Sequence, residues 1–333
     1  MWKDERVIAV GDNAVVLLDS TGRVEREISK EGFRCTTNSV AAATDLVCVA
    51  TSDKAKIAFI SESQSYRVSV PELITAVAFS RCGDILYAGS NTGRLYVWQI
   101  RTGTLIKNKQ VFFNTITDAK VDFANTTLLL ASQNGDLALF KLVELFLDDN
   151  KGTLYLGHST SVTGIANLMQ GPFEHATSFV SVARDKNIRF WHHTKRTALQ
   201  SHFLQHPPLG LVASRTGARL FVPCEMGHIA VVPLGNFQDT FLLSGHVGSV
   251  TGCAETLNLV TCALDGVRVW DVEARICISH YGNIGNGDHH YPDVPAGPRI
   301  NKLLSGVRLA EKAQFVPLKN VVSQDSLATI ALN

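Results

Sequence analysis

The sequence predicts an all-β fold in which seven consecutive repeats, each a small four-stranded sheet, close into a ring. The clearest repeat spans residues 244–282, where two short apolar segments, residues 257–263 and 267–270, flank the turn residues Asp265-Gly266. Asp-Gly between two β-prone segments is a strong signal for a β-hairpin. The pattern of the second segment (aliphatic, any residue, apolar, large apolar) recurs along the chain at nearly constant spacing. This favours a seven-bladed β-propeller over a sandwich, which has no reason to repeat at a fixed period.

The seven occurrences of this pattern define the predicted blades. They end at Leu18, Ile60, Trp98, Phe140, Trp191, Val232 and Trp270. The intervals between these residues are 42, 38, 42, 51, 41 and 38 residues, and one blade of a repeat propeller takes roughly 40–45 residues. One interval is therefore long, and it separates blades four and five.

Two dipeptides at the ends of the last repeat carry a family resemblance. Gly245-His246 opens the repeat and Trp270-Asp271 closes it. Both dipeptides at blade spacing around an Asp-Gly hairpin resemble the WD-repeat family. The resemblance implies that His246, Asp265 and Trp270 are hydrogen-bonded across the blade, and we place the closing Asp271 in the same structural set.

The fifth repeat carries the same features with one departure. It begins with Gly157-His158 and ends with Trp191, but His192 follows where the closing Asp would stand. Asp185 occupies the hairpin position that Asp265 occupies in the last repeat. The resemblance therefore implies a second network of His158, Asp185 and Trp191.

Taken in order, the repeats predict a propeller over residues 1–310 and a tail over residues 311–333. The predicted blades are residues 5–30 plus 299–309, 33–70, 72–109, 115–157, 158–204, 207–243 and 244–282. Blade two lacks a Trp. Blade six contains Pro223 and Pro233 in strand-like runs, so we expect edges or bulges there, because proline cannot donate to a sheet ladder.

Blade one is incomplete at the N-terminus. Residues 6–29 supply only three strands, whereas a blade needs four. After a Gly- and Pro-rich connector over residues 283–298, residues 299–309 return to a strand-compatible pattern. We therefore predict that this segment supplies the missing innermost strand and closes the ring, which removes an open sheet edge.

The long interval between blades four and five predicts an inserted helix. Residues 143–149 form the predicted insertion. Leu142, Leu145 and Phe146 fall at helical spacing in and just before it. Two readings stay open for these three residues. The helix packs onto its own blade, or it serves as a docking element for a partner.

Composition and charge exclude several classes of protein. The formal net charge is +1 and 18% of the residues are charged, so no broad field for nucleic acid or an anionic membrane is expected. The seven cysteines are scattered and mostly inside predicted strands, as expected of small buried side chains in a reducing compartment. The N-terminus lacks the apolar core of a signal peptide, and no apolar run has the roughly 18 residues of a membrane helix. We expect a soluble intracellular protein.

No catalytic motif, cofactor-binding motif or metal site is predicted. Cys277, His280, His289 and His290 lie close in sequence, but their spacing matches no standard zinc site. Five basic residues gather around blade five, and they indicate either a solvated rim or a secondary contact with RNA phosphate. These are Arg184, Lys186, Arg189, Lys195 and Arg196.

The order of features is similar to one branch of the WD-repeat family, the WD-repeat subunits of Rix-type ribosome-biogenesis complexes, which includes WD repeat-containing protein 18. The shared features are the three-stranded opening, the insertion over residues 143–149, a strong fifth repeat, a Trp-less sixth repeat with Gly227-His228, and Cys277-Ile278 after the last repeat.

This resemblance implies a non-catalytic scaffold in large-subunit assembly and pre-rRNA processing. It implies a nuclear location in the nucleolus or nucleoplasm, and as partners an α-solenoid scaffold and a remodelling ATPase. Two other readings stay open. One is an adaptor in another complex, such as a ubiquitin ligase or a trafficking coat, which would act in the cytoplasm. The other is an enzyme that uses the central channel, which no acid–base pair supports.

Overall fold

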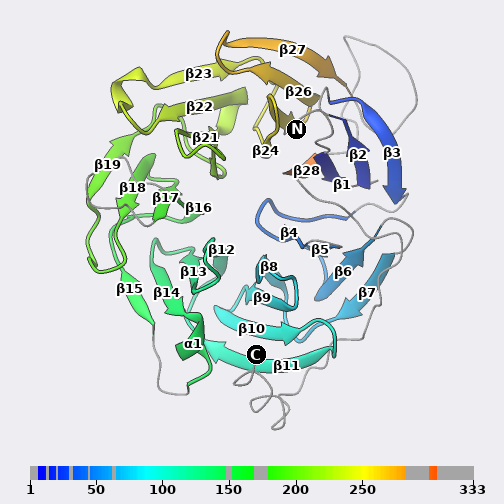
Figure 1. Cartoon of the computed structure of the whole chain (residues 1–333), viewed down its shortest axis with the longest axis vertical. Helices are drawn as coiled ribbons and strands as arrows, with labels where there is room; N and C mark the ends of the chain where they lie inside the picture. Colours follow the sequence, from blue (N-terminus) through cyan, green and yellow to red (C-terminus); the bar gives the residue numbers. More distant parts are fainter. Residues whose placement is uncertain are drawn as a thin grey trace.

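The computed structural model describes residues 7–12, 15–19, 22–29, 33–43, 46–61, 65–147, 152–168, 179–282 and, for the backbone alone, 300–305. Within these residues the chain forms seven four-stranded antiparallel sheets, which Figure 1 shows arranged as blades around a central axis. The predicted seven-bladed propeller is therefore confirmed. The predicted tail over residues 311–333 and the connector over residues 283–298 lie outside the described residues.

Each blade contributes four strands, ordered from the axis to the rim. Blade one contains β28 (Ile300–Ser305), β1 (Val7–Gly11), β2 (Val15–Leu18) and β3 (Val24–Ser29). Blade two contains β4 (Val40–Ala42), β5 (Val47–Ala50), β6 (Lys56–Ile60) and β7 (Ser65–Ser69). Blade three contains β8 (Ile74–Phe79), β9 (Ile85–Ser90), β10 (Arg94–Gln99) and β11 (Thr104–Gln110). Blade four contains β12 (Ile116–Val121), β13 (Thr127–Ser132), β14 (Leu137–Lys141) and β15 (Thr153–Tyr155), with the short helix α1 (Leu142–Leu145) after β14.

The remaining three blades follow the same order. Blade five contains β16 (Val162–Asn167), β17 (Phe179–Ala183), β18 (Asn187–Trp191) and β19 (Gln200–Phe203). Blade six contains β20 (Val212–Ala213), β21 (Arg219–Pro223), β22 (His228–Pro233) and β23 (Phe241–Ser244), with two short 3₁₀ turns at Glu225–Gly227 and Phe237–Asp239. Blade seven contains β24 (Gly252–Glu255), β25 (Leu259–Ala263), β26 (Gly266–Asp271) and β27 (Ile276–Tyr281).

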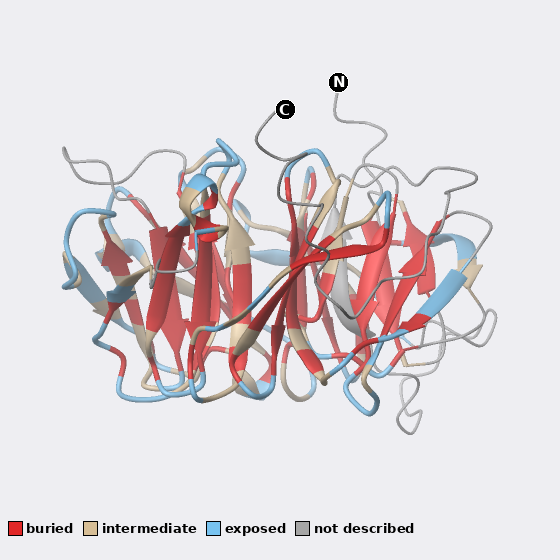
Figure 2. Cartoon of the chain, turned by 90° about the horizontal axis from the view of Figure 1, so that it is seen from below, coloured by how far each residue is buried: buried red, intermediate tan, exposed pale blue. Residues whose placement is uncertain are grey.

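The repeating pattern of the sequence marks the same strand in every blade. Its seven occurrences fall on β2, β6, β10, β14, β18, β22 and β26, the third strand counted from the axis. These strands are buried along most of their length because both faces of each sheet pack against a neighbouring blade. Figure 2 shows the result, with buried strands in the body of the ring and exposed residues in the loops of the two faces.

Packing between blades joins the ring. Tyr155 at the end of β15 packs edge-on against Trp191 of blade five, with ring centroids 5.8 Å apart. Trp270 of blade seven belongs to a cluster with Phe221 and Val231 of blade six. Trp191 and Trp270 thus each fill the space between their own blade and the preceding one.

The Asp265-Gly266 turn forms the hairpin that the sequence predicts. It joins β25 to β26, and Ala263 pairs with Gly266. Gly266 has a φ of +113°, and a Cβ there would lie 2.1 Å from the carbonyl oxygen of Tyr281. Glycine is therefore required by the backbone conformation and by the close approach of the outer strand.

The prolines of blade six lie elsewhere than expected. Pro223 is the last residue of β21 and Pro233 is the last residue of β22, and neither strand is at the edge of its sheet. The expectation of an edge or a bulge is corrected: a strand terminus accommodates proline because the ladder ends there.

The two ends of the chain meet in blade one. β28 pairs antiparallel with β1, from Val7 opposite Ser305 to Gly11 opposite Ile300. This pairing is consistent with the predicted closure by residues 299–309, of which residues 306–309 lie outside the described part. Farther from the axis, Nε of Arg23 in blade one donates a hydrogen bond of 3.2 Å to the hydroxyl of Tyr281 in blade seven.

Candidate functional site

Three of the polar side chains singled out in blade seven belong to one hydrogen-bonded network. His246 lies in the loop between β23 and β24, Asp265 in the turn after β25, and Trp270 in β26. Nδ1 of His246 lies 2.6 Å from Oδ1 of Asp265. His246 and Trp270 do not contact each other by a hydrogen bond; both reach the hydroxyl of Thr261 in β25, each at 2.7 Å.

Blade five contains the same arrangement with serine in place of threonine. Nδ1 of His158 lies 3.0 Å from Oδ2 of Asp185. Nε2 of His158 and Nε1 of Trp191 lie 2.7 and 2.8 Å from the hydroxyl of Ser181. Ser181 and Thr261 are fully buried, and the sequence analysis missed both. A hydroxyl residue in the middle of an apolar second strand is the signal that identifies them.

The hydrogen bonds of each network run in one direction when the histidine is neutral. The indole N–H donates to the hydroxyl, the hydroxyl donates to Nε2, and Nδ1–H donates to the carboxylate. The pKa values of His158 and His246 are lowered, because burial outweighs the neighbouring aspartates. Burial opposes ionisation of Asp265, but its hydrogen bonds with His246 and Arg268 hold its pKa at about 2. Each network is thus a neutral imidazole beside a carboxylate.

Asp271 lies outside the network of its blade. Its carboxylate accepts hydrogen bonds of 2.9 Å from the backbone N–H groups of Glu273 and Ala274. Asp271 therefore holds the turn between β26 and β27, at the opposite end of β26 from Asp265. Its place in the structural set is corrected accordingly.

The insertion after β14 packs its apolar side chains against the propeller. Leu142 and Leu145 are buried between blades three and four, and Phe146 packs against the same cluster. Leu142 and Leu145 are therefore core residues, and Phe146 lies half-buried against the same cluster, as expected of a helix that packs onto its own blade. The exposed apolar residues of this segment are Val143 and Leu147, which are 87% and 61% exposed.

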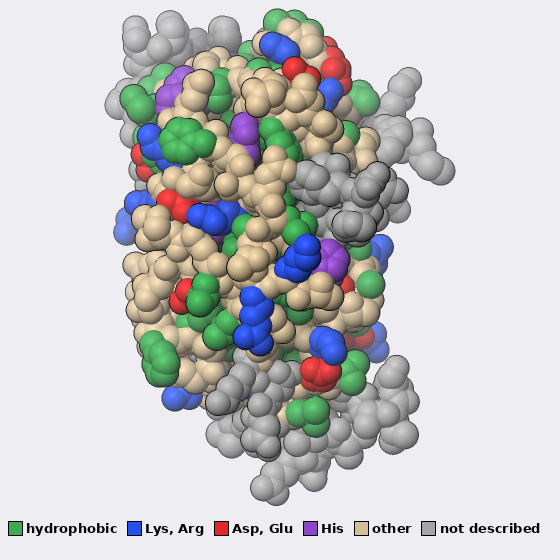
Figure 3. Space-filling view, turned by 90° about the vertical axis from the view of Figure 1, so that its left-hand side faces the viewer, with side chains coloured by type: hydrophobic (Ala, Val, Ile, Leu, Met, Phe, Trp, Pro, Cys, Tyr) green, Lys and Arg blue, Asp and Glu red, His purple; other side chains and the backbone are tan. Residues whose placement is uncertain are grey.

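The basic residues of blade five do not form one patch. Arg184 and Lys186 lie in the turn before β18, Arg189 lies within β18, and Lys195 and Arg196 lie in the loop after it. The length of β18 thus separates the two pairs. Figure 3, which faces the rim near β15 and β19, shows Lys and Arg side chains scattered over this side, with Asp, Glu and His side chains among them. This separation favours the interpretation of these basic residues as a solvated rim over that of a contact with RNA phosphate.

The centre of the ring holds a turn of the chain itself. The segment Thr36–Ser39 leads into β4 and reaches the ring's centre (Figure 1). Nδ2 of Asn38 donates hydrogen bonds of 2.9 Å to the carbonyl oxygens of both Thr117 in blade four and Thr163 in blade five. The hydroxyl of Thr37 donates to the carbonyl of Thr251 beside blade seven at 2.9 Å.

This turn therefore ties blade two to blades that are not its neighbours. The hydroxyl of Thr36 also bonds the carbonyl of Thr75 in blade three at 3.3 Å. We name Thr36–Ser39 the central turn. Its side chains thus donate hydrogen bonds to backbone carbonyls in or beside blades three, four, five and seven.

Other kinds of site find no support in the described part of the chain. There, no group of three or more His, Cys, Asp and Glu side chains is placed to hold a metal ion. His280 instead approaches the backbone oxygen of Asp265 at 3.0 Å, and His289 and His290 lie outside the described residues. All seven cysteines are unbridged, and five of them are buried. No described helix has the length and apolar character needed to cross a membrane.

Comparison with known families finds WD repeats in two parts of the chain. The family described as "WD domain, G-beta repeat" matches residues 64–99 and 150–192. Among solved structures, the computationally designed Ika8 protein superimposes with a TM-score of 0.61, at 20% identity, and covers 90% of this chain and 92% of that chain. This likeness shows the fold alone.

Curated relatives extend the comparison to named proteins. The pre-rRNA-processing protein IPI3 of Yarrowia lipolytica is 28% identical over 203 residues, which cover 60% of this chain and 46% of that protein. The pre-rRNA-processing protein crb3/ipi3 of Schizosaccharomyces pombe is 25% identical over 194 residues, covering 55% and 43%. The protein ROOT INITIATION DEFECTIVE 3 of Arabidopsis thaliana is 28% identical over 138 residues, covering 39% and 30%. Each alignment spans less than half the length of the relative.

Proposed function

Because this chain is a seven-bladed WD-repeat β-propeller, we propose that it is a non-catalytic interaction scaffold in large ribosomal subunit assembly and pre-rRNA processing. One observation carries the proposal: the chain is similar to pre-rRNA-processing proteins of several fungi, at 25–28% identity for two of them over more than half of this chain. The order of the repeats and the insertion after the fourth repeat support the same assignment.

The geometry supports a scaffold rather than an enzyme. A His–Asp pair can carry out acid–base chemistry, but here each histidine side chain is fully buried inside its blade. Its second ring nitrogen, Nε2, is hydrogen-bonded to a buried hydroxyl. No substrate reaches a group in that position. These polar residues therefore stabilise blades.

Partners and location belong to the same proposal. We expect an α-solenoid scaffold and a remodelling ATPase as protein partners on precursor particles, and a location in the nucleolus or nucleoplasm. RNA contact is secondary, because the basic side chains of blade five are spread along the whole height of the rim.

Affinity purification followed by mass spectrometry tests the proposal. The tagged chain should recover large-subunit assembly factors and pre-ribosomal proteins, and a tagged unrelated propeller should not. Recovery of ubiquitin-ligase or coat subunits would instead support an adaptor in another complex. Depletion should cause precursors that retain an internal transcribed spacer to accumulate, and re-expression should reverse this. Normal precursor levels after full depletion would contradict the proposal.

A further inference from the structure

Arg189 differs from the other basic residues of blade five, because part of its guanidinium is buried without a partner. It lies within β18 and packs against the backbone of Gly157, where a Cβ would lie 3.2 Å from Nη1. Its Nε is buried and has no hydrogen-bond partner, and no carboxylate among the described residues pairs with it. Buried donors in native proteins nearly always have a partner, so an unpaired one calls for an explanation.

The equivalent arginine of blade seven shows which partner fits at this position. Arg189 and Arg268 each stand two residues before the tryptophan of their blade. Nε and Nη2 of Arg268 donate hydrogen bonds of 3.2 and 3.0 Å to Oδ2 of Asp265. A carboxylate suits the position because the planar guanidinium offers two parallel donors to it.

The length of the hairpin turn explains why Arg189 lacks this partner. Asp265 stands three residues before Arg268, whereas Asp185 stands four residues before Arg189. The carboxylate of Asp185 instead contacts the imidazole of His158 and accepts hydrogen bonds from two backbone N–H groups. Blade five therefore keeps the arginine but supplies no carboxylate for it.

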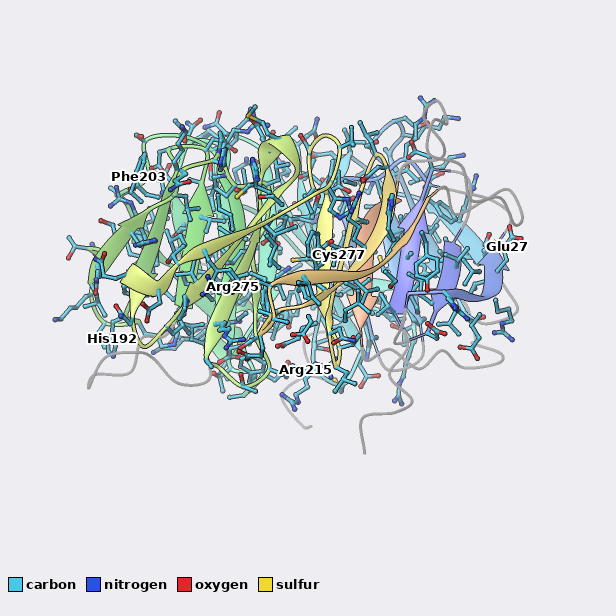
Figure 4. The ribbon with its side chains drawn as sticks, turned by 90° about the horizontal axis from the view of Figure 1, so that it is seen from above. Glu27, His192, Phe203, Arg215, Arg275 and Cys277 are labelled. Atoms are coloured by element: carbon cyan, nitrogen blue, oxygen red, sulfur yellow. The ribbon has the colours of Figure 1, made fainter. Side chains whose placement is uncertain are left out.

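An exposed aromatic side chain lies beside Arg189. β18 pairs with β19 so that Ser201 stands opposite Arg189 and Phe203 stands opposite Asn187. These four residues lie on the side of the sheet that faces blade four, because the intervening Ile188 belongs to the cluster shared with blade six. Phe203 is 65% exposed and is a diagonal neighbour of Arg189, which is within reach of long side chains. Figure 4 shows Phe203 at the rim of the ring.

We propose that Arg189, Ser201 and Phe203 form a docking surface, here named the Arg189 surface, for a protein segment in which an acidic residue adjoins an apolar one. The acidic side chain takes the place that Asp265 fills in blade seven, and the apolar side chain covers Phe203. RNA is a poorer occupant, because a nucleic-acid strand needs a row of cations and those of blade five are divided between the two ends of β18. The inference rests on the proposed scaffold function only in that the occupant is a protein.

A pair of substitutions tests whether Arg189 serves the fold or a partner. Arg189→Met should leave the thermal midpoint of the isolated chain unchanged or raise it, because it removes a buried donor that has no partner. Arg268→Met is the matched control and should lower the midpoint, because it leaves Asp265 without its cation. A loss in Arg189→Met as large as that of the control would make Arg189 a structural residue and overturn the proposal.

Selection from a random-peptide phage library on the immobilised full chain shows what the surface binds. The parent should enrich peptides in which Asp or Glu adjoins an apolar residue. The enriched peptide, synthesised with a fluorescent label, should bind Arg189→Met about tenfold more weakly or worse, as expected for loss of one hydrogen bond to a charged group. Arg196→Met removes the same charge from the loop at the other end of β18 and should bind like the parent.

Two results would contradict the proposal at the binding step. One is the absence of acidic residues from the enriched peptides, or equal binding of the peptide by the parent and Arg189→Met. The other is binding of a single-stranded RNA oligonucleotide that depends on Arg189 while the peptide does not bind. Because these measurements use the purified chain, their outcome is independent of precursor levels in depleted cells, which test the proposed function.

Discussion

At the scale of single residues, Thr261 and Ser181 hold the two buried networks together. Each hydroxyl accepts a hydrogen bond from tryptophan and donates one to histidine, so it links the second strand of the blade to the third strand and to the incoming loop. Loss of the hydroxyl leaves two buried nitrogen atoms without a partner, whereas loss of an unbonded hydroxyl leaves none.

Thr261→Val should therefore lower the free energy of unfolding by about 1–3 kcal/mol, the cost of leaving buried polar groups unsatisfied. Thr117 offers a matched control, because its buried hydroxyl has no hydrogen-bond partner. Thr117→Val should be neutral or slightly stabilising. Urea unfolding of both variants checks the pair, and equal destabilisation would show that valine itself, and not the lost network, is responsible.

The same residues predict an acid-sensitive fold. The pKa values of His158 and His246 lie below their ordinary value of 6.5 when folded. As the pH falls below about 6.5, the unfolded chain takes up protons that the folded chain does not, so stability falls. Asp265, with a folded pKa of about 2 against 3.8, adds a second loss below about pH 4.

Denaturant unfolding between pH 8 and pH 5 measures the first loss. The double variant His158→Gln, His246→Gln should be less stable at pH 8 and should lose less on acidification than the parent. His193, His202 and His228 also have pKa values lowered by burial, so some dependence should remain. An unchanged slope would contradict neutral histidines in the networks.

At the scale of elements, the central turn joins blades that are not adjacent. One amide group of Asn38 satisfies carbonyl oxygens of two different blades. Asn38→Ala should cost about 1–3 kcal/mol, toward the lower end because water reaches part of the site. Asn38→Asp should cost more, because a carboxylate would face two carbonyl oxygens.

Asn134→Ala is the matched control for this prediction. Asn134 is an exposed residue of a turn in blade four and is expected to change stability by a few tenths of a kcal/mol at most. Hydrogen exchange at β12 and β16 should increase in Asn38→Ala and stay unchanged in the control. Equal thermal midpoints for the parent, Asn38→Ala and Asn134→Ala would show that the hydrogen bonds of Asn38 do not stabilise the ring.

At the scale of the whole molecule, pairing between distant parts of the sequence closes the ring. β28 supplies the innermost strand of blade one. Ending the chain at Gly297 removes this strand and exposes the inner edge of β1, so the truncated protein should aggregate or lose protection against proteolysis. Ending it near Leu318 should be tolerated.

Limited proteolysis and size-exclusion chromatography of the two truncations check this expectation. Amides of residues 300–305 should also exchange about as slowly as those of blade seven in the full chain. A soluble, monodisperse protein ending at Gly297 would show that blade one is stable without β28.

The sequence by itself determined the ring of seven blades. A single four-residue pattern recurs because the third strand of every blade is buried on both faces and must be apolar in the same register. The hairpin at Asp265-Gly266 was equally predictable, since the required glycine conformation is local. The His–Asp contacts followed from the family resemblance.

Only the tertiary structure decided what lies between blades and across the axis. In the sequence, Thr261 and Ser181 look like ordinary strand residues. Only the structure shows that a tryptophan nitrogen and a histidine nitrogen both contact each hydroxyl. The basic residues of blade five are close in sequence but separated by the length of β18, and Leu142 and Leu145 turn into the core beside blade three. Asn38 gave no signal, because its partners lie 79 and 125 residues away, and no local pattern encodes contacts at such separation.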